Sequence, residues 1–174
     1  MKQSSVNSML KISLFSALIV VSAMISIPFP IPITLQTFAI FLAFFTLGGV
    51  KAFAAVTVYT ALGIVGLPVF AGFNSGVGYI LGASGGFVIA FPLSAILFAV
   101  LEAVFGKSNK KRLIYATLAL VLIYAVGTLW FSSVYSDGRG FYASVMVVVL
   151  PFIPFDTLKL ILAYTVSKRL KKIL

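Results

Sequence analysis

Residues 85–105 read GGFVIAFPLSAILFAVLEAVF and contain a single charged side chain, Glu102, close to their end. A stretch of this length and apolarity matches what an α-helix needs to cross the hydrocarbon core of a bilayer. A soluble chain of this size has too small an interior to bury several such helices. The stretch therefore predicts a transmembrane helix.

The rest of the 174-residue chain has the same character, with 61% hydrophobic and 9% charged residues, whereas an ordinary soluble domain is about 25% charged. Five more stretches are near the length of a membrane helix, and they cover residues 9–27, 33–50, 52–67, 113–131 and 143–166. Pro151 and Pro154 interrupt the last stretch, so we expect a short helix before Pro151 and a spanning helix from Pro154 onward. The sequence predicts an all-α integral membrane protein, a single domain of six transmembrane helices over residues 1–174.

The positive charges support this topology. The chain has 13 Lys and Arg against 3 Asp and Glu, a net charge of +10, and basic residues collect in cytoplasmic segments of membrane proteins. If the chain has six spans and both termini are in the cytoplasm, eleven basic residues lie on the cytoplasmic side. They are Lys2, Lys11, Lys51, Lys107, Lys110, Lys111, Arg112, Lys168, Arg169, Lys171 and Lys172. Arg139 falls outside, and Lys159 falls within a span. The basic run 107–112 is thus interpreted as a cytoplasmic loop rather than a nucleic-acid site.

The beginning of the chain allows a second interpretation. Lys2 and Lys11, followed by an apolar run with Val21-Ser22-Ala23, also fit a signal peptide. The run continues beyond that point, and its small side chains suit helix packing in lipid. These features favour a spanning helix.

The composition leaves little room for catalysis. There is no Cys and no His, so thiolate nucleophiles and the commonest metal ligand are excluded. No glycine-rich segment is followed by the Lys and Ser or Thr that complete a phosphate-binding loop. Glu102 is interpreted as an interfacial charge beside Lys107, and Asp137 and Arg139 as part of an outer turn. We expect no catalytic residue, no metal, no cofactor and no ATPase activity.

Two outer connections contain features that favour a ligand site. Residues 27–37 carry three alternating prolines, which stiffen an extended backbone, followed by Gln36, whose amide needs a partner inside a span. Residues 66–87 hold seven of the fourteen glycines and are too apolar for a solvated linker, so we expect them to pack over or into the bundle. Asn74 and Tyr79 are their obvious hydrogen-bonding groups. The alternatives are a rigid turn and a glycine-rich packing loop.

Asp156 and Lys159 form the sharpest feature. They are three residues apart, on one face of the last helix, and directly follow the proline break. The expected position of Asp156 is the first turn, where the helix dipole favours an anion. Charges inside a span are costly unless paired or hydrated and usually face a cavity. The pair predicts a ligand site; an ion pair that only neutralises itself is the alternative.

Four motifs in this order resemble the BioY family, the biotin-binding S components of energy-coupling-factor (ECF) transporters. They are Ile31-Pro32-Ile33-Thr34-Leu35-Gln36-Thr37, Gly66-Leu67-Pro68-Val69-Phe70-Ala71-Gly72, Gly82-Ala83-Ser84-Gly85-Gly86-Phe87 and Leu150-Pro151-Phe152-Ile153-Pro154-Phe155-Asp156-Thr157-Leu158-Lys159. The likeness covers nearly the whole chain. The chain departs from the family pattern at Ala83-Ser84, where Pro-Thr is common, and at Phe87, where Tyr is common. The hydroxyl that a Tyr would provide is therefore absent at Phe87.

The resemblance implies the six-helix S-component fold and high-affinity biotin uptake through an outward-facing cavity capped by the two outer connections. The family's polar ligand contacts would fall on Asn74, Asp156 and Lys159, with Tyr79 as a wall; Gln36 joins them through its position. Import would need a transmembrane coupling protein and two cytoplasmic ATPase subunits. Their docking surface would match, loosely, the first helix near Ser13, Ala17 and Val21.

The expected location is the plasma membrane of a prokaryote, with lipid around the helices. Three other interpretations stay open: an S component for another vitamin, such as thiamine or riboflavin, a membrane scaffold that binds no small molecule, and transport by this chain without the ATPase subunits. An intramembrane enzyme is disfavoured, because the chain has no His, no Cys and no paired carboxylates.

Overall fold

The apolar stretches form helices in the computed structural model, which describes residues 3–135 and 140–172. Within these residues the fold is all-α, as predicted, apart from a hairpin of two short strands, β1 (Ser26–Ile27) and β2 (Ile33–Thr34). The longer helices are α1 (Gln3–Met24), α2 (Gln36–Leu47), α3 (Gly49–Ile64), α5 (Gly85–Phe105), α6 (Asn109–Val134) and α8 (Phe152–Leu170). The shorter ones are η1 (Ala71–Phe73), α4 (Gly76–Ile80) and α7 (Gly140–Val148).

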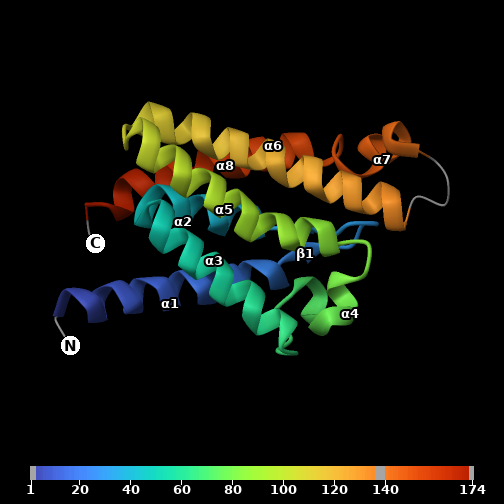
Figure 1. Cartoon of the computed structure of the whole chain (residues 1–174), viewed down its shortest axis with the longest axis horizontal. Helices are drawn as coiled ribbons and strands as arrows, with labels where there is room; N and C mark the ends of the chain where they lie inside the picture. Colours follow the sequence, from blue (N-terminus) through green and yellow to red (C-terminus); the bar gives the residue numbers. More distant parts are fainter. Residues whose placement is uncertain (1–2, 136–139, 173–174) are drawn as a thin grey trace.

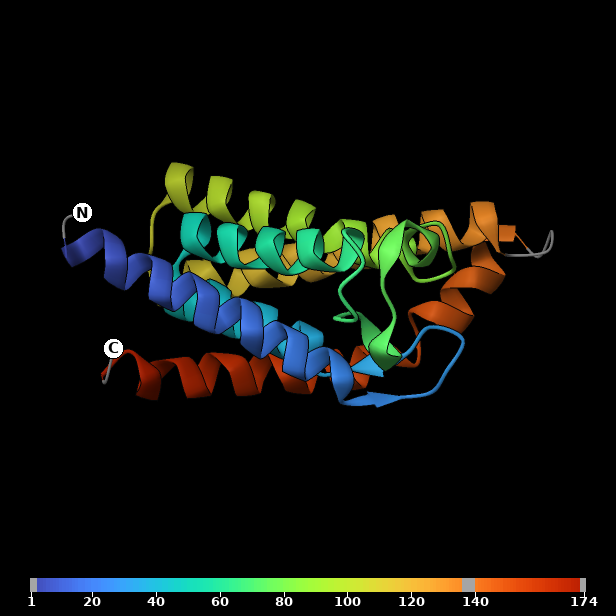
Figure 2. The same cartoon turned by 90° about the horizontal axis from the view of Figure 1, so that it is seen from below.

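The longer helices run between two ends of a bundle (Figure 1, Figure 2). The start of α1, the α2–α3 corner, the α5–α6 turn and the end of α8 lie together, and we call this the terminal end. The opposite end holds the β1–β2 hairpin, residues 65–84 and α7, and we call it the loop end. Helix α2 is central, because it packs against α1, α3 and α8 and is buried along most of its length.

Three of the described helices are long and apolar enough to cross a membrane: α1 from Ser5, α5 and α6. The pair α7–α8, bent by 49° at the predicted proline break, makes a fourth span if it is counted as one. Helices α2 and α3 have 12 and 16 residues, fewer than the roughly 17–25 that span a bilayer. Each predicted segment thus contains a helix, and three of them, or four if the α7–α8 pair is counted as one span, meet the length criterion, so the count of six spans stays a prediction.

The outer connection after α1 shortens the first two predicted helices. Helix α1 ends at Met24 and α2 starts at Gln36, because the chain between them folds into the hairpin. Ser26 pairs with Thr34 and Ile27 with Ile33. The prolines that the sequence places between the strands have no backbone donor and cannot continue a helix.

The second outer connection packs into the bundle, as predicted. Val69, Phe70 and Ala71 are buried, Phe70 completely. The ring of Phe70 lies against Gly63 of α3, where an added Cβ would come within 2.1 Å of it. Glycine at this position therefore lets residues 65–75 fold back onto the helices.

Helix α8 begins at Phe152, two residues earlier than predicted, with Pro151 as its N-cap. Pro154 fits within the first turn, where backbone N–H groups have no intrahelical acceptor. Asp156 consequently lies in the second turn, and its predicted place in the first turn is wrong. Stabilisation of its charge must come from side chains rather than from the helix dipole, which acts mainly within the first turn.

Glu102 also differs from its prediction. The carboxylate is buried and pairs with Arg112 of α6 rather than with Lys107. Asp137 and Arg139, which were predicted to form an outer turn, lie outside the described residues, as does Lys2. Ten of the eleven basic residues assigned to the cytoplasm are described; they lie on the terminal half of α1, at the start of α3, in or next to the α5–α6 turn and at the end of α8.

The α5–α6 interface provides a test of the packing. A Cβ on Gly86 of α5 would lie 2.2 Å from the Cβ of Trp130 of α6 and 3.1 Å from the Val126 carbonyl oxygen, so the helices would have to separate. We expect Gly86→Ala to destabilise the fold by about 1–3 kcal/mol, to lower the melting temperature in detergent, and to alter the emission of Trp130, the chain's single tryptophan.

Gly78→Ala is the matched control, because a Cβ there meets nothing within 4 Å. Equal melting temperatures for the two variants would contradict the close α5–α6 contact.

Candidate functional site

A cavity opens at the loop end between α2, α5, α6 and α8. It encloses about 510 Å³ of empty space, part of it open to the outside, which is within the size range of small-molecule sites. Its walls are mainly apolar and include aromatic side chains of α5 and α8. The lining residues are Ile31, Pro32, Thr34, Gln36, Thr37, Ala71, Tyr79, Ser84, Phe87, Val88, Phe91, Ile123, Tyr124, Phe152, Asp156 and Lys159.

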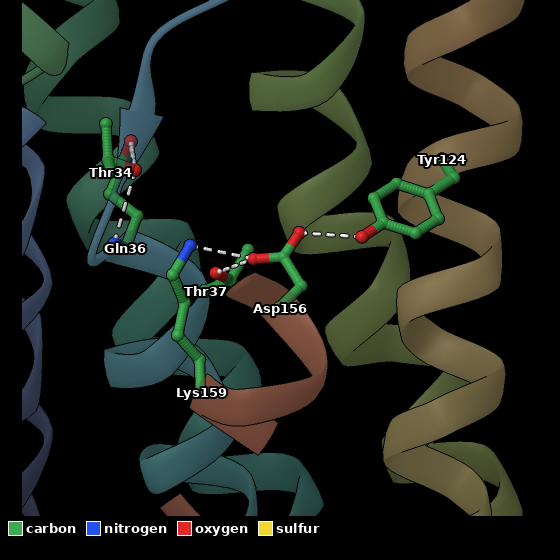
Figure 3. Close-up of polar contacts among 6 residues, drawn as sticks. All are labelled: Thr34, Gln36, Thr37, Tyr124, Asp156 and Lys159. Atoms are coloured by element: carbon green, nitrogen blue, oxygen red, sulfur yellow. Dashed lines mark hydrogen bonds and ion pairs between the residues drawn. The ribbon is translucent and has the colours of Figure 1, made fainter. Parts of the chain in front are cut away.

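The carboxylate of Asp156 is the polar centre of this cavity (Figure 3). One oxygen, Oδ1, accepts hydrogen bonds of 2.8 Å from the Thr37 hydroxyl and from the Lys159 ammonium. The other, Oδ2, accepts a 2.8 Å bond from the Tyr124 hydroxyl. Asp156 is only 2% exposed, so these donors, which come from α2, α8 and α6, replace the water that the charge has lost.

Lys159 presents its ammonium to the cavity. The side chain is 7% exposed and ion-pairs with Asp156 at 2.8 Å. An ammonium has three donors, and the other two make no hydrogen bond with the described residues. Since buried donors need partners, this group is suited to bind a ligand oxygen.

Gln36 lies at the start of α2 and lines the same cavity. Its amide donates to the Tyr59 hydroxyl, and its Oε1 accepts a 2.9 Å hydrogen bond from Thr34. The predicted need for a partner is therefore met within the protein, by one residue of α3 and one of the hairpin. These bonds fix the orientation of the amide at the cavity wall.

Tyr79 of α4 lines the cavity, and its ring begins a series of three aromatic rings in contact. Tyr79 stacks on Phe70 with ring centroids 5.1 Å apart, and Phe70 meets the edge of Tyr59 at 5.8 Å. Burial raises the pKa of Tyr79, while a hydrogen bond with Ser84 acts in the opposite direction. The phenol therefore stays neutral, and its ring offers a flat face to a ligand.

A second, more open pocket adjoins the first. It contains about 910 Å³ of empty space, much of it open to the outside, and shares Pro32, Tyr79 and Ser84 with the inner cavity. Asn74 lines this outer pocket only. Its Nδ2 donates a 2.7 Å bond to the Ala71 carbonyl. The structure thus groups Gln36, Tyr79, Asp156 and Lys159 around the inner cavity and sets Asn74 apart at its mouth.

The three residues predicted for partner docking line neither pocket and lie together on one helix. Ser13, Ala17 and Val21 are spaced by four along α1, and all three are exposed. They form a strip of mainly small side chains on the outer face of the bundle.

Comparisons with known proteins agree with one another. Residues 1–174 match the BioY family. A relative from Thermotoga maritima, named biotin transporter BioY, is 39% identical, and the alignment covers 95% of this chain and 96% of the relative. One from Pyrococcus horikoshii, named probable biotin transporter BioY, is 37% identical, with 92% and 93% covered. This chain belongs to the BioY family.

A solved structure gives the same result for the fold. It is a crystal structure of the S-component for biotin from an ECF-type ABC transporter, and it superposes on this BioY chain with a TM-score of 0.86. The two chains are 29% identical, with 99% of this chain and 94% of the other covered. The resemblance stated from the four motifs is therefore confirmed.

Sequence reasoning missed the two hydroxyls that hold the Asp156 carboxylate together with Lys159, those of Thr37 and Tyr124. Thr37 stands next to Gln36, but a hydroxyl in a helix commonly bonds to its own backbone, so its type alone gave no signal. Tyr124 lies in the middle of an apolar span, where a phenol needs a partner. That need is a signal for a buried acceptor, but it does not identify Asp156, which is 32 residues away.

Removal of the Tyr124 hydroxyl tests the network. Tyr124→Phe leaves Oδ2 of Asp156 without its donor, and an unsatisfied buried acceptor costs about 1–3 kcal/mol. We expect a lower melting temperature of the ligand-free protein in detergent. Tyr115→Phe is the matched control, since its hydroxyl makes only a 3.4 Å bond to the Gly106 carbonyl. Equal melting temperatures for the two variants would show that Tyr124 does not stabilise the charge.

Proposed function

We propose that this BioY chain binds biotin with high affinity as the S component of an ECF-type importer. The observation that carries the proposal is the apolar cavity with a buried Asp156–Lys159 pair, in which two donors of the ammonium have no partner among the described residues. Membership of the BioY family and the names of its relatives support it. A scaffold without a ligand has no need for such a cavity.

The chemistry of biotin suits this cavity. Biotin combines a compact, partly apolar bicycle with a ureido group, which has two N–H donors and one carbonyl, and with a carboxylate tail. The free donors of Lys159 can bond the ureido oxygen. The Asp156 carboxylate accepts three hydrogen bonds and has room for about one more, from a ureido N–H. Tyr79 and the aromatic walls would enclose the bicycle.

Charge balance indicates which end of biotin enters first. Asp156 and Lys159 neutralise each other, so a neutral ureido group leaves the buried site without net charge. A carboxylate at the same place would add an uncompensated buried charge, which is costly. We therefore place the ureido group at Asp156 and Lys159. The carboxylate tail would then point to the open outer pocket, within reach of Asn74.

The connections at the loop end would cap the bound ligand. Pro32 of the hairpin and Tyr79 and Ser84 of the second connection border both pockets. A ligand in the inner cavity would be covered by these residues. In this arrangement the loop end faces outward and receives biotin from outside the cell.

The charge distribution supports the same orientation in the membrane. The described basic residues outside the cavity lie toward the terminal end, and the positive-inside rule places such an end in the cytoplasm. We propose a single unit of six membrane-embedded segments with cytoplasmic termini in a prokaryotic plasma membrane. Helices α2 and α3 would be short segments enclosed by longer neighbours.

Import would require further subunits. The sequence has no phosphate loop, so the energy would come from two cytoplasmic ATPase subunits through a transmembrane coupling protein. The exposed strip of Ser13, Ala17 and Val21 on α1 would provide the docking surface. Small side chains allow helices in lipid to approach closely.

The charged pair is the first target for mutation. In Asp156→Asn or Lys159→Ala, one buried charge stays without its partner, at a cost of about 3–5 kcal/mol. We expect the dissociation constant for biotin to rise at least about 100-fold, measured by calorimetry on purified protein. Lys168→Ala, an exposed lysine on the same helix, is the control and should bind like the wild type. Wild-type affinity in either site variant would refute the site.

The orientation of biotin in the cavity can be tested with a biotin derivative whose tail carboxylate is replaced by a neutral amide. If the ureido group lies at Asp156 and Lys159, the neutral tail amide should bind within about tenfold of biotin, because its changed group faces the open pocket. A derivative methylated on a ureido nitrogen should lose most of the affinity. The opposite ranking would place the carboxylate at Lys159.

A further inference from the structure

A second buried ion pair lies at the terminal end of the bundle, at the other end of α2. Glu102 of α5 is 5% exposed and pairs with Arg112 of α6 through both Nε and Nη2 of the guanidinium. Its other oxygen, Oε2, accepts a 2.7 Å hydrogen bond from the backbone N–H of Gly49. Nη1 of Arg112 donates a 3.2 Å bond to the carbonyl of Phe45. We call these four residues the corner clamp.

The corner clamp satisfies two helix ends that have no caps of their own. Gly48 separates α2 from α3, and neither helix has a side-chain cap at this corner. The Phe45 carbonyl is one of the last four of α2, and the Gly49 N–H is the first of α3, so neither has an intrahelical partner. A cation at the end of α2 and an anion at the start of α3 also match both helix dipoles.

The backbone at Gly48 and Gly49 is closely packed against α5 and α6. Gly48 has φ +82, and a Cβ there would lie 3.2 Å from Glu102 and 3.3 Å from Arg112. A Cβ on Gly49 would lie 2.4 Å from the Cα of Ala99 on α5. The α5–α6 hairpin therefore holds the backbone of this corner directly.

Helix α2 connects the corner clamp to the cavity. Its first turn carries Gln36 and Thr37, which line the cavity, and Phe45 stands in its last turn. The side chains between Thr37 and Phe45 are apolar, and apolar contacts are not directional. The directional contacts of α2 with other helices thus lie at its two ends.

Apolar contacts accept small axial adjustments of a helix more readily than hydrogen bonds do, because the lengths of hydrogen bonds vary by only a few tenths of an ångström. A shift of α2 by one residue corresponds to about 1.5 Å. Such a shift would break the 2.8 Å bond from Thr37 to Asp156. The hydrogen bonds of Arg112 to Phe45 and of Gly49 to Glu102 oppose such a shift from the opposite end of the helix.

We propose that Glu102 and Arg112 are positioning residues for the ligand site: the corner clamp fixes the axial position of α2 and thereby holds Thr37 and Gln36 at the cavity. The inference rests on the proposed function, since biotin binding is its readout. It assigns a role in ligand affinity to an ion pair that touches neither the cavity nor the ligand.

The test compares two variants that break different halves of the corner clamp. Glu102→Gln removes the charge that balances Arg112, and Arg112→Lys keeps a charge but loses the planar fork that also reaches Phe45. Lys107→Gln, exposed in the same turn, is the control. We expect each clamp variant to weaken biotin binding about tenfold and the control to bind like the wild type, by calorimetry well below the melting temperature of each protein.

A role in stability alone predicts a different result. Clamp variants would then melt at lower temperature, while the folded fraction would bind biotin with the wild-type dissociation constant, and this outcome overturns the inference. Failure of the wild type to bind biotin would instead refute the proposed function.

Hydrogen exchange on the wild type provides a test that does not depend on the variants folding. Because coupling between two sites is reciprocal, biotin should slow amide exchange at residues 48–52 more than at residues 107–111. Equal protection of both segments would overturn the inference.

Discussion

The carboxylate of Asp156 is the point on which the arrangement of the loop end depends. A charge that is 2% exposed must find donors inside the protein, and it finds them on α2, α6 and α8. Helices α6 and α8 make few other contacts with each other, so Tyr124 and Asp156 link two helices that otherwise stand apart. The space between them is part of the cavity. The Asp156 carboxylate thus links the helices around the cavity and also forms part of the cavity wall.

In the part of the chain that the structure describes, two buried ion pairs differ in the partners of their cationic donors. At the terminal end, Arg112 is bonded to Glu102 and to the Phe45 carbonyl, and the partner carboxylate also holds Gly49. At the loop end, Asp156 is the one hydrogen-bond partner of the Lys159 ammonium within residues 3–135 and 140–172. The first pair is enclosed by backbone and fixes a corner, whereas the second faces a cavity and has donors to spare. Binding and positioning follow from the same chemistry in different surroundings.

The sequence predicted the elements whose signal is local. Apolar stretches marked the helices, prolines marked the break before α8, and the spacing of Asp156 and Lys159 placed both on one helix face. The glycine-rich connection was correctly expected to pack into the bundle, because it is too apolar for solvent. The four motifs were sufficient to recognise the BioY family.

What the sequence could not predict depends on contacts between distant residues. Thr37 meets Asp156 across 119 positions of the chain, and Gly49 meets Glu102 across 53. Lys107 is nearer to Glu102 in sequence than Arg112 is, but only Arg112 reaches it from the first turn of α6. The boundaries of α1 and α2 differ from the prediction because Ser26 pairs with Thr34, which ends α1 earlier and starts α2 later. The apolar composition of these residues gave no sign of the strand pairing.

The most direct test of this account is a calorimetric titration of the purified wild-type protein with biotin, with thiamine and riboflavin as controls. We expect saturable binding of about one biotin per chain, and no binding of either control. Saturation by thiamine or riboflavin instead would place the chain with another vitamin. Absence of saturable binding of all three by folded protein would contradict the claim that the cavity around Asp156 and Lys159 is a vitamin site.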